Sequence, residues 1–232
     1  MRHGTPGGPR ETVWWSGGLD ECRPRPLVLV VGGAFVRREE YLPLFARLVR
    51  RGHAVVAAVP ADPAGYVARS AGLVSRLVDA YVRTAATART QVIGLDLGGR
   101  LALGAAATDT RIAAVHLVGA PVARLFAEAD RPFALPPATT GRLARSVGAD
   151  RRARLPALLG GLELRPEELY DVRARVRVGY TVDDPLTPPQ DLALLRLTLK
   201  DAEFRAFRSR GGATPAGRPV HRWLASGTRA GR

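Results

Sequence analysis

The residues with the clearest chemical potential lie around Asp96, a carboxylate flanked by Gly94 and Gly98. An apolar segment precedes these glycines and small residues follow them. This spacing predicts a sharp turn from a strand into a helix, because a side chain at either glycine would crowd the neighbouring backbone. Such a turn lifts the central side chain above a sheet and into a crevice. The start of the following helix would offer free N–H groups and a positive dipole end.

Four histidines are available as partners for such a carboxylate. His3 belongs to the N-terminal tail and His53 begins an apolar run. His116 lies within an apolar strand pattern and is typical of a core histidine. His221 follows the last expected strand, where it is either a general base or a surface residue.

The elements that must position these residues follow from the hydrophobic pattern. Continuous apolar runs rich in β-branched residues are typical of strands buried on both faces of a parallel sheet. Segments of helical period separate these runs. The expected strands are 27–31, 53–59, 91–95, 112–118, 172–182 and 202–207, and the expected helices are 41–50, about 67–85, 99–107, 190–199 and a last turn at 220–225. The alternation predicts an α/β fold with a doubly wound, mostly parallel sheet.

The chain has 232 residues and is expected to form a single domain over 11–232, after a flexible tail at 1–10 with little apolar content. Residues 11–25 leave room for one short strand. The alternation breaks at about 122–171, where prolines, arginines and short leucine-containing pieces predict an insertion. Ligands of open α/β sheets bind beyond the strand carboxyl ends, so this insertion is expected to be a short helical lid.

Three segments together resemble the α/β-hydrolase superfamily, over roughly residues 26–225. Residues 94–99 (Gly-Leu-Asp-Leu-Gly-Gly) take the place of its nucleophile elbow, usually written Gly-x-Ser-x-Gly. Residues 30–35 look like the strand and loop that complete its oxyanion hole, and residues 182–188 are similar to its acid-bearing turn. The order of elbow, lid, acid and histidine also matches. The resemblance implies an α/β-hydrolase-like enzyme with a catalytic triad.

Asp96 stands where this superfamily usually has serine, as in its haloalkane dehalogenases and epoxide hydrolases. The resemblance implies that Asp96 attacks carbon in a small epoxide, halide or ester-like metabolite, leaving an ester on the enzyme. His221 would activate water against that ester, oriented by Asp184. Asp184 is favoured over Asp183 because it directly precedes Pro185.

The same resemblance implies oxyanion and substrate contacts at Gly33, Ala34 and Leu97. Leu97 departs from the tryptophan that usually follows an elbow aspartate. Tyr170 is the only tyrosine of the insertion and the only candidate there for the acid of an epoxide hydrolase. Two alternatives stay open: a scaffold repurposed as a lyase or cyclase, in which aspartate and histidine transfer protons, or a non-catalytic binding protein.

The sequence contains no pattern that indicates a nucleotide cofactor or a bound metal ion. No Gly-Lys-Ser/Thr follows the elbow, and the first strand turn lacks the dinucleotide fingerprint. Carboxylates show no metal-ligand spacing with histidine. We therefore expect no cofactor and no metal. Cys22 is the only cysteine, which excludes an intramolecular disulfide.

The formal net charge at pH 7 is +14, but the arginines that produce it are spread along the whole sequence. Lys200 is the only lysine, a bias that favours a GC-rich bacterial genome over a nucleic-acid site. We expect a small-molecule substrate and no specific nucleic acid, and leave a homodimer open. Without an apolar span or a leader pattern, the expected location is the cytoplasm, away from the membrane. The arginine-rich, lysine-poor composition also suggests a role in secondary metabolism, by association only.

Overall fold

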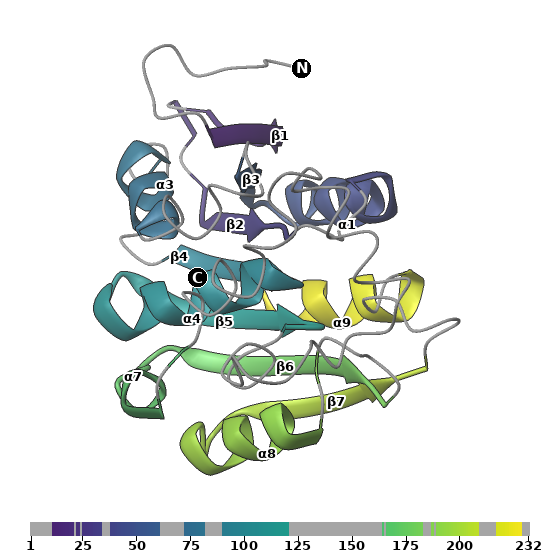
Figure 1. Cartoon of the computed structure of the whole chain (residues 1–232). Helices are drawn as coiled ribbons and strands as arrows, with labels where there is room; N and C mark the ends of the chain where they lie inside the picture. The colour runs from purple at the N-terminus through teal and green to yellow at the C-terminus, as the bar shows by residue number, and fades with distance from the viewer. Residues whose placement is uncertain are drawn as a thin grey trace, which may run out of the picture.

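The computed structural model describes residues 11–20, 22–23, 25–33, 38–60, 72–81, 90–120, 164, 166–182, 187, 189–208 and 217–228. The strands are β1 (Glu11–Gly17), β2 (Leu27–Val31), β3 (Ala54–Pro60), β4 (Thr90–Leu95), β5 (Ile112–Val118), β6 (Arg175–Thr181) and β7 (Glu203–Phe207). The helices are α1 (Arg38–Arg50), α3 (Leu73–Tyr81), α4 (Leu97–Thr108), α7 (Pro166–Tyr170), α8 (Pro189–Thr198) and α9 (Arg218–Gly227). From β2 onward, strands and helices alternate through most of the chain, as Figure 1 shows.

The strands form one sheet in the order β1-β3-β2-β4-β5-β6-β7. β1 pairs antiparallel with β3, and its register is irregular between Val13 and Trp15. All other neighbouring strands are parallel. The prediction of a doubly wound, mostly parallel sheet is therefore confirmed, and so is a short strand within residues 11–25.

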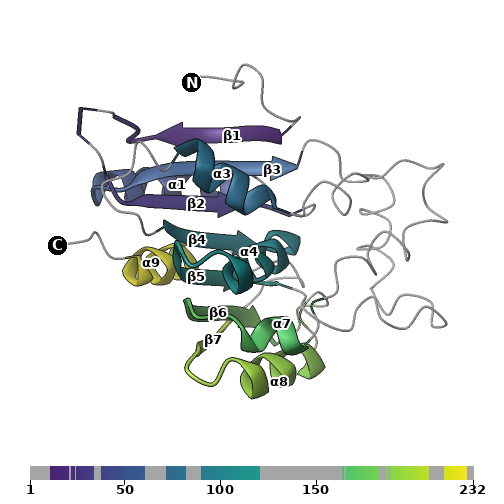
Figure 2. The ribbon, with the colours of Figure 1, turned by 90° about the vertical axis from the view of Figure 1, so that its left-hand side faces the viewer.

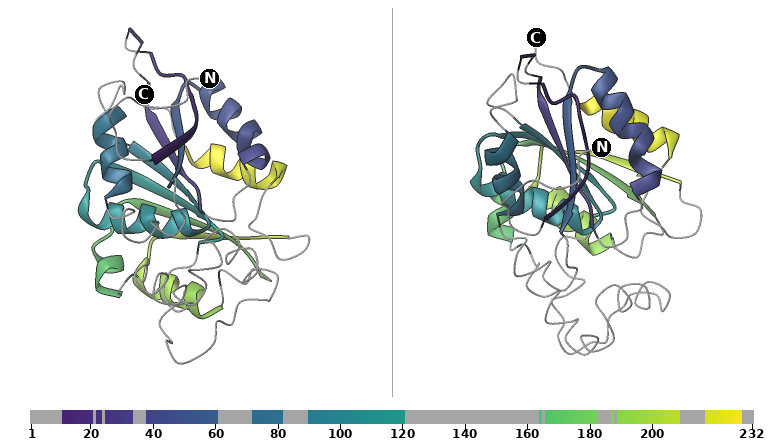
Figure 3. Two further views of the ribbon diagram at one scale, coloured as in Figure 1. Left: turned by 45° about the horizontal axis from the view of Figure 1, so that its top comes forward. Right: turned by 90° about the horizontal axis from the view of Figure 1, so that it is seen from above.

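Helices cover both faces of this sheet, which explains why its strands are apolar at successive positions. In β2, alternate residues enter two separate cores, and every one is fully buried. Helices α3, α4, α7 and α8 cover one face, whereas α1 and α9 lie side by side on the other (Figures 1 and 3). Burial on both faces is what a continuous β-branched run such as Leu27–Val31 requires.

The parallel strands end at a common edge of the sheet, the side toward which β2 and β3 point in Figure 2. β4 ends at this edge with Leu95, and α4 begins with Leu97. Only Asp96 separates the two elements. The residue expected at the nucleophile position therefore sits where ligands of open α/β sheets bind.

The last part of the expected insertion packs as a sheet-covering element. Helix α7 lies against α4 and α8, and Leu164 and Leu169 are buried in the core of that face. The rest of the expected lid, residues 122–163 and 165, and the tail at 1–10 lie outside the described residues. Within the described ranges, no helix combines the length and apolar character that crossing a membrane would take.

Candidate functional site

Asp96 adopts a strained backbone conformation between β4 and α4. Its φ is 55° and its ψ is −132°, and no other non-glycine residue in the described ranges has a positive φ. Such strain clusters at functional sites, where the surrounding structure must hold it. The Asp96 N–H donates to the Val118 carbonyl (2.9 Å), and the Gly99 N–H donates to the Asp96 carbonyl (2.9 Å). The expected sharp strand-to-helix turn is present.

Close backbone contacts explain why the turn contains glycines. A Cβ at Gly98 would overlap the carbonyl oxygen of Val31, and a Cβ at Gly94 would overlap the Cα of Gly99. The start of α4 can therefore approach the end of β2 only if these positions carry no side chain. This crowding is what the spacing of the two glycines predicted.

The carboxylate of Asp96 lies between the end of β2 and the start of α4. A Cβ built on Gly33 would lie 2.6 Å from Asp96 Oδ2 and 2.6 Å from the Leu97 nitrogen. Gly33, the Leu97 N–H and the carboxylate thus surround one small volume, and Asp96 is fully buried. A helix N-terminus stabilises nearby negative charge, so an anion formed beside Leu97 would be favoured.

His221 lies at the end of the first turn of α9 rather than in a loop, and is 5% exposed. Its ring packs against Tyr41 of α1, with ring centroids 5.5 Å apart and an interplanar angle of 50°. Burial, with a smaller contribution from the positive charge of Arg47, lowers the pKa of His221 below its ordinary value of 6.5. The imidazole is therefore neutral at pH 7, the form that can accept a proton.

His221 and Asp96 lie on separate elements, His221 in α9 and Asp96 in the turn between β4 and α4. The buried Nε2 of His221 has no hydrogen-bond partner among the described residues. Tyr41 was missed as a neighbour of the candidate base, because its spacing with Leu44, Phe45 and Leu48 marks it only as part of an apolar helix face.

A polar network attaches α9 to the sheet two residues beyond His221. The Arg177 guanidinium donates to both carboxylate oxygens of Glu203 (2.8 and 2.9 Å) and to the Trp223 carbonyl (2.9 Å). The indole N–H of Trp223 donates to Glu203 (3.0 Å), and the guanidinium stacks 4.4 Å from the Trp223 ring. These bonds to Arg177 lower the pKa of Glu203 to about 2. The network fixes the helix that carries His221.

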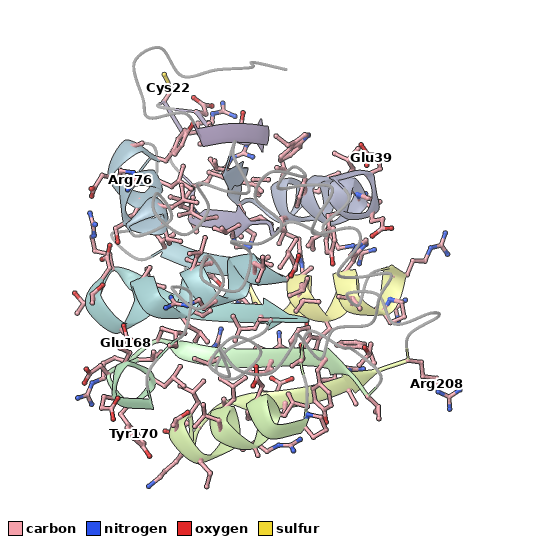
Figure 4. All side chains as sticks on the ribbon, viewed as in Figure 1. Cys22, Glu39, Arg76, Glu168, Tyr170 and Arg208 are labelled. Carbon is pink, nitrogen blue, oxygen red and sulfur yellow. The ribbon has the colours of Figure 1, made fainter. Side chains whose placement is uncertain are left out.

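Of the other expected site residues, the structure describes only Tyr170. Tyr170 ends α7, is 58% exposed, and points outward into solvent in Figure 4. The short α7 packs as part of the sheet-covering layer, and a contact of Tyr170 with substrate stays a prediction. Ala34 and Asp184 lie outside the described residues.

His116 has the environment of a core residue, as its strand pattern predicted. It is fully buried in β5, and burial together with the charges of Arg177 and Arg175 lowers its pKa to about 3. It is therefore neutral. Across the described ranges, no three His, Cys, Asp or Glu side chains gather in a way that could hold a metal ion.

The chain is similar to known proteins in its three-dimensional structure. No protein-family model and no curated protein matches the sequence. Two structures of a protein called AbyA5 match with TM-scores of 0.77 and 0.76, at 30% and 27% identity. Each alignment covers 96% of this chain, and 67% and 69% of the AbyA5 chains.

Two more distant structures share the fold. A thioesterase domain from the curacin biosynthetic pathway matches with a TM-score of 0.62 at 15% identity, over 97% of this chain and 96% of its own. An alpha/beta hydrolase enzyme from a sediment metagenome of the Mar Chica lagoon, Morocco, matches with a TM-score of 0.65 at 15% identity, over 92% and 90%.

Proposed function

Because this chain belongs to the α/β-hydrolase superfamily of enzymes, we propose that it hydrolyses a small organic epoxide, halide or ester-like metabolite through a covalent intermediate on Asp96. One observation carries this proposal. The carboxylate of Asp96 occupies the strained turn between β4 and α4, where a nucleophile of this fold belongs, and it lies against Gly33 and the Leu97 N–H.

In the first step, a carboxylate oxygen of Asp96 forms a bond to the polarised carbon of the substrate. The carbon–halogen or carbon–oxygen bond breaks, and the electron pair leaves with the halide or with the epoxide oxygen, which takes up a proton. The product of this step is an ester between Asp96 and the substrate carbon. Aspartate suits this attack because, unlike serine, an ionised carboxylate has no proton to lose.

In the second step, His221 takes a proton from a water molecule, whose oxygen adds to the Asp96 carbonyl carbon. The negative charge that develops on the ester oxygen is stabilised by the Leu97 N–H at the start of α4. On collapse, the bond from the Asp96 carbonyl carbon to the alcohol oxygen breaks, and the His221 imidazolium gives its proton to that oxygen. The carboxyl group, which now holds one oxygen from water, loses its remaining proton to solvent and is a carboxylate again. Asp184 is the proposed partner that orients the imidazole.

Transfer of water oxygen into Asp96 provides the decisive test. Cleavage after Arg89 and Arg100 releases the peptide 90–100, in which Asp96 is the only side-chain carboxylate. The enzyme, in excess over a panel of small epoxides and alkyl halides, is allowed one turnover in heavy-oxygen water. We expect label in this peptide and none in the product. Label in the product alone would mean direct attack by water and would overturn the covalent step.

Variants separate the two steps and the roles of the residues. His221→Gln is expected to stall after the first step, so that peptide 90–100 carries the mass of the substrate. Asp96→Asn should show no adduct. His53→Gln, which replaces a buried histidine just before β3, should turn over normally. Turnover without label or adduct would instead favour proton-transfer chemistry, as in a lyase or cyclase.

A further inference from the structure

A groove lined largely by arginines runs between α1 and α9, on the sheet face that carries His221. Its volume is about 410 Å³. The lining residues are Arg47, Arg50, Arg51, Arg222 and Ser226. Each of them is exposed. All lie in α1 or α9 except Arg51, which directly follows α1, and the two helices pack side by side in Figures 1 and 3. Four positive charges therefore converge on one concave surface.

None of these four guanidinium groups pairs with a carboxylate in the part of the chain that the structure describes. Arg51 donates to the Ala225 carbonyl, and Arg50 donates to the Ala46 carbonyl of its own helix (3.4 Å). By contrast, Arg111 pairs with Asp79 and Asp109 at 2.7 Å each, and Arg177 pairs with Glu203 at 2.8 Å. The groove is set apart because four arginines without such a partner among the described residues line one concave surface.

Helix electrostatics explain only part of this cluster. Arg47 and Arg50 lie in the last turn of α1, where the negative end of the helix dipole favours cations. Arg222 lies in the first half of α9, where the dipole gives no such advantage. Like charges that share a groove repel one another, and a bound anion would relieve that repulsion.

We propose that this groove binds a multiply charged phosphate group, with diphosphate as the smallest sufficient ligand. Guanidinium forks match phosphate oxygens in bidentate pairs, and two linked phosphates carry enough charge to engage arginines from both helices. The hydroxyl of Ser226 adds a further donor. The volume lies within the usual range for small-molecule sites of about 300–1,000 Å³. A concave site of this size favours a small anion over a broad macromolecular surface.

The test measures binding and needs no catalytic turnover, so it is independent of the proposed hydrolysis. Isothermal titration with inorganic diphosphate is expected to show one saturable site, and inorganic phosphate should bind at least about tenfold more weakly. A nucleoside diphosphate forms a further arm. If the nucleoside diphosphate binds with the same affinity as inorganic diphosphate, the groove contacts only the phosphates. If it binds more tightly, the groove also contacts the nucleoside.

A charge-matched pair of variants distinguishes the groove from the general positive charge. Arg47→Gln/Arg222→Gln removes one arginine from each helix and leaves Arg51 in its contact with Ala225. Arg173→Gln/Arg208→Gln removes the same charge at exposed positions elsewhere, one of them labelled in Figure 4. We expect the first pair to weaken diphosphate binding by about tenfold or more, and the second by less than about twofold.

Three results would overturn the proposal. The first is the absence of saturable diphosphate binding to the unaltered protein, and the second is an equal loss in both double variants. The third is strong binding of duplex DNA with a steep salt dependence while diphosphate binds only weakly, which would indicate a surface for a polyanionic polymer. A matching rise in melting temperature with diphosphate, lost only in the groove variant, would support the site independently.

Discussion

At the scale of a single residue, the proposed nucleophile Asp96 has a strained backbone conformation, with a φ of 55°. A positive φ is unfavourable for a residue with a Cβ, and residues held in such regions cost about 1–3 kcal/mol. The Asp96 side chain does not compensate by capping α4. The conformation is therefore maintained by the sheet and helix on either side, for a reason other than local stability.

Replacing Asp96 with glycine should consequently stabilise the fold. We expect Asp96→Gly to raise the free energy of unfolding by about 1 kcal/mol, because released strain exceeds the added chain entropy. Ala107→Gly, within α4 but at ordinary helical geometry, should lower it by about 1 kcal/mol. Urea denaturation measures both. A loss of stability in Asp96→Gly would contradict the strain argument.

A second prediction concerns the charge state of His221. The positive charge of Arg47 disfavours the imidazolium form, so Arg47→Gln should raise the pKa of His221 toward its ordinary value. Burial remains the larger cause of the lowered pKa, so the rise should be partial. NMR titration of the His221 ring protons measures it. Arg50→Gln is the control, and an equal shift there would mean that no specific pair is involved.

At the scale of elements, the site depends on how closely the start of α4 approaches the end of β2. That approach fixes the position of the Leu97 N–H relative to Asp96, and it is set by backbone atoms at Gly98 and Val31. The requirement is steric. Adding a single methyl group at this contact should therefore lower the free energy of unfolding strongly.

Two alanine substitutions in the same helix test this requirement. Gly98→Ala should lower the free energy of unfolding by about 3 kcal/mol or more, because its Cβ would overlap the Val31 carbonyl. Gly104→Ala places its Cβ 3.3 Å from the flexible end of Arg100 and 3.5 Å from Leu164, so helix propensity should make it neutral or stabilising. Similar losses for both variants would refute this account.

At the scale of the whole molecule, one acidic residue joins three elements. Glu203 on β7 binds Arg177 on β6 and Trp223 on α9. Its pKa is lowered to about 2 from an ordinary 4.5, so the ionised form stabilises the fold. That contribution is complete above pH 4.5 and is lost as the pH falls toward 2.

The fold of a Glu203→Gln variant should therefore be less sensitive to acid. We expect the unaltered protein to be more stable than Glu203→Gln at pH 6, with the difference shrinking as the pH falls from 4.5 toward 2. Urea denaturation across that range measures the difference. Glu40→Gln, on the exposed first turn of α1, is the control. A difference that stays constant with pH would contradict the role of Glu203.

Much of this architecture is predictable because it depends on local pattern. The apolar runs of β2, β4 and β5 require burial on both faces, and the glycines around Asp96 require a tight turn. Long-range packing is not predictable in this way. The sequence of the short helix that ends at Tyr170 does not indicate against which elements it packs. The arginine groove is a second example. Arg51 and Arg222 are 171 positions apart, and only the packing of α1 against α9 brings them together.

The irregular pairing of β1 has a bearing on how copies of this protein meet one another. β1 is the outermost strand on its side of the described sheet, and its register shifts between Val13 and Trp15. A bulge twists a strand and breaks the even ladder of donors and acceptors that an incoming chain would need. The irregular β1 is therefore a poorer template than a regular edge strand for pairing with the sheet of another copy.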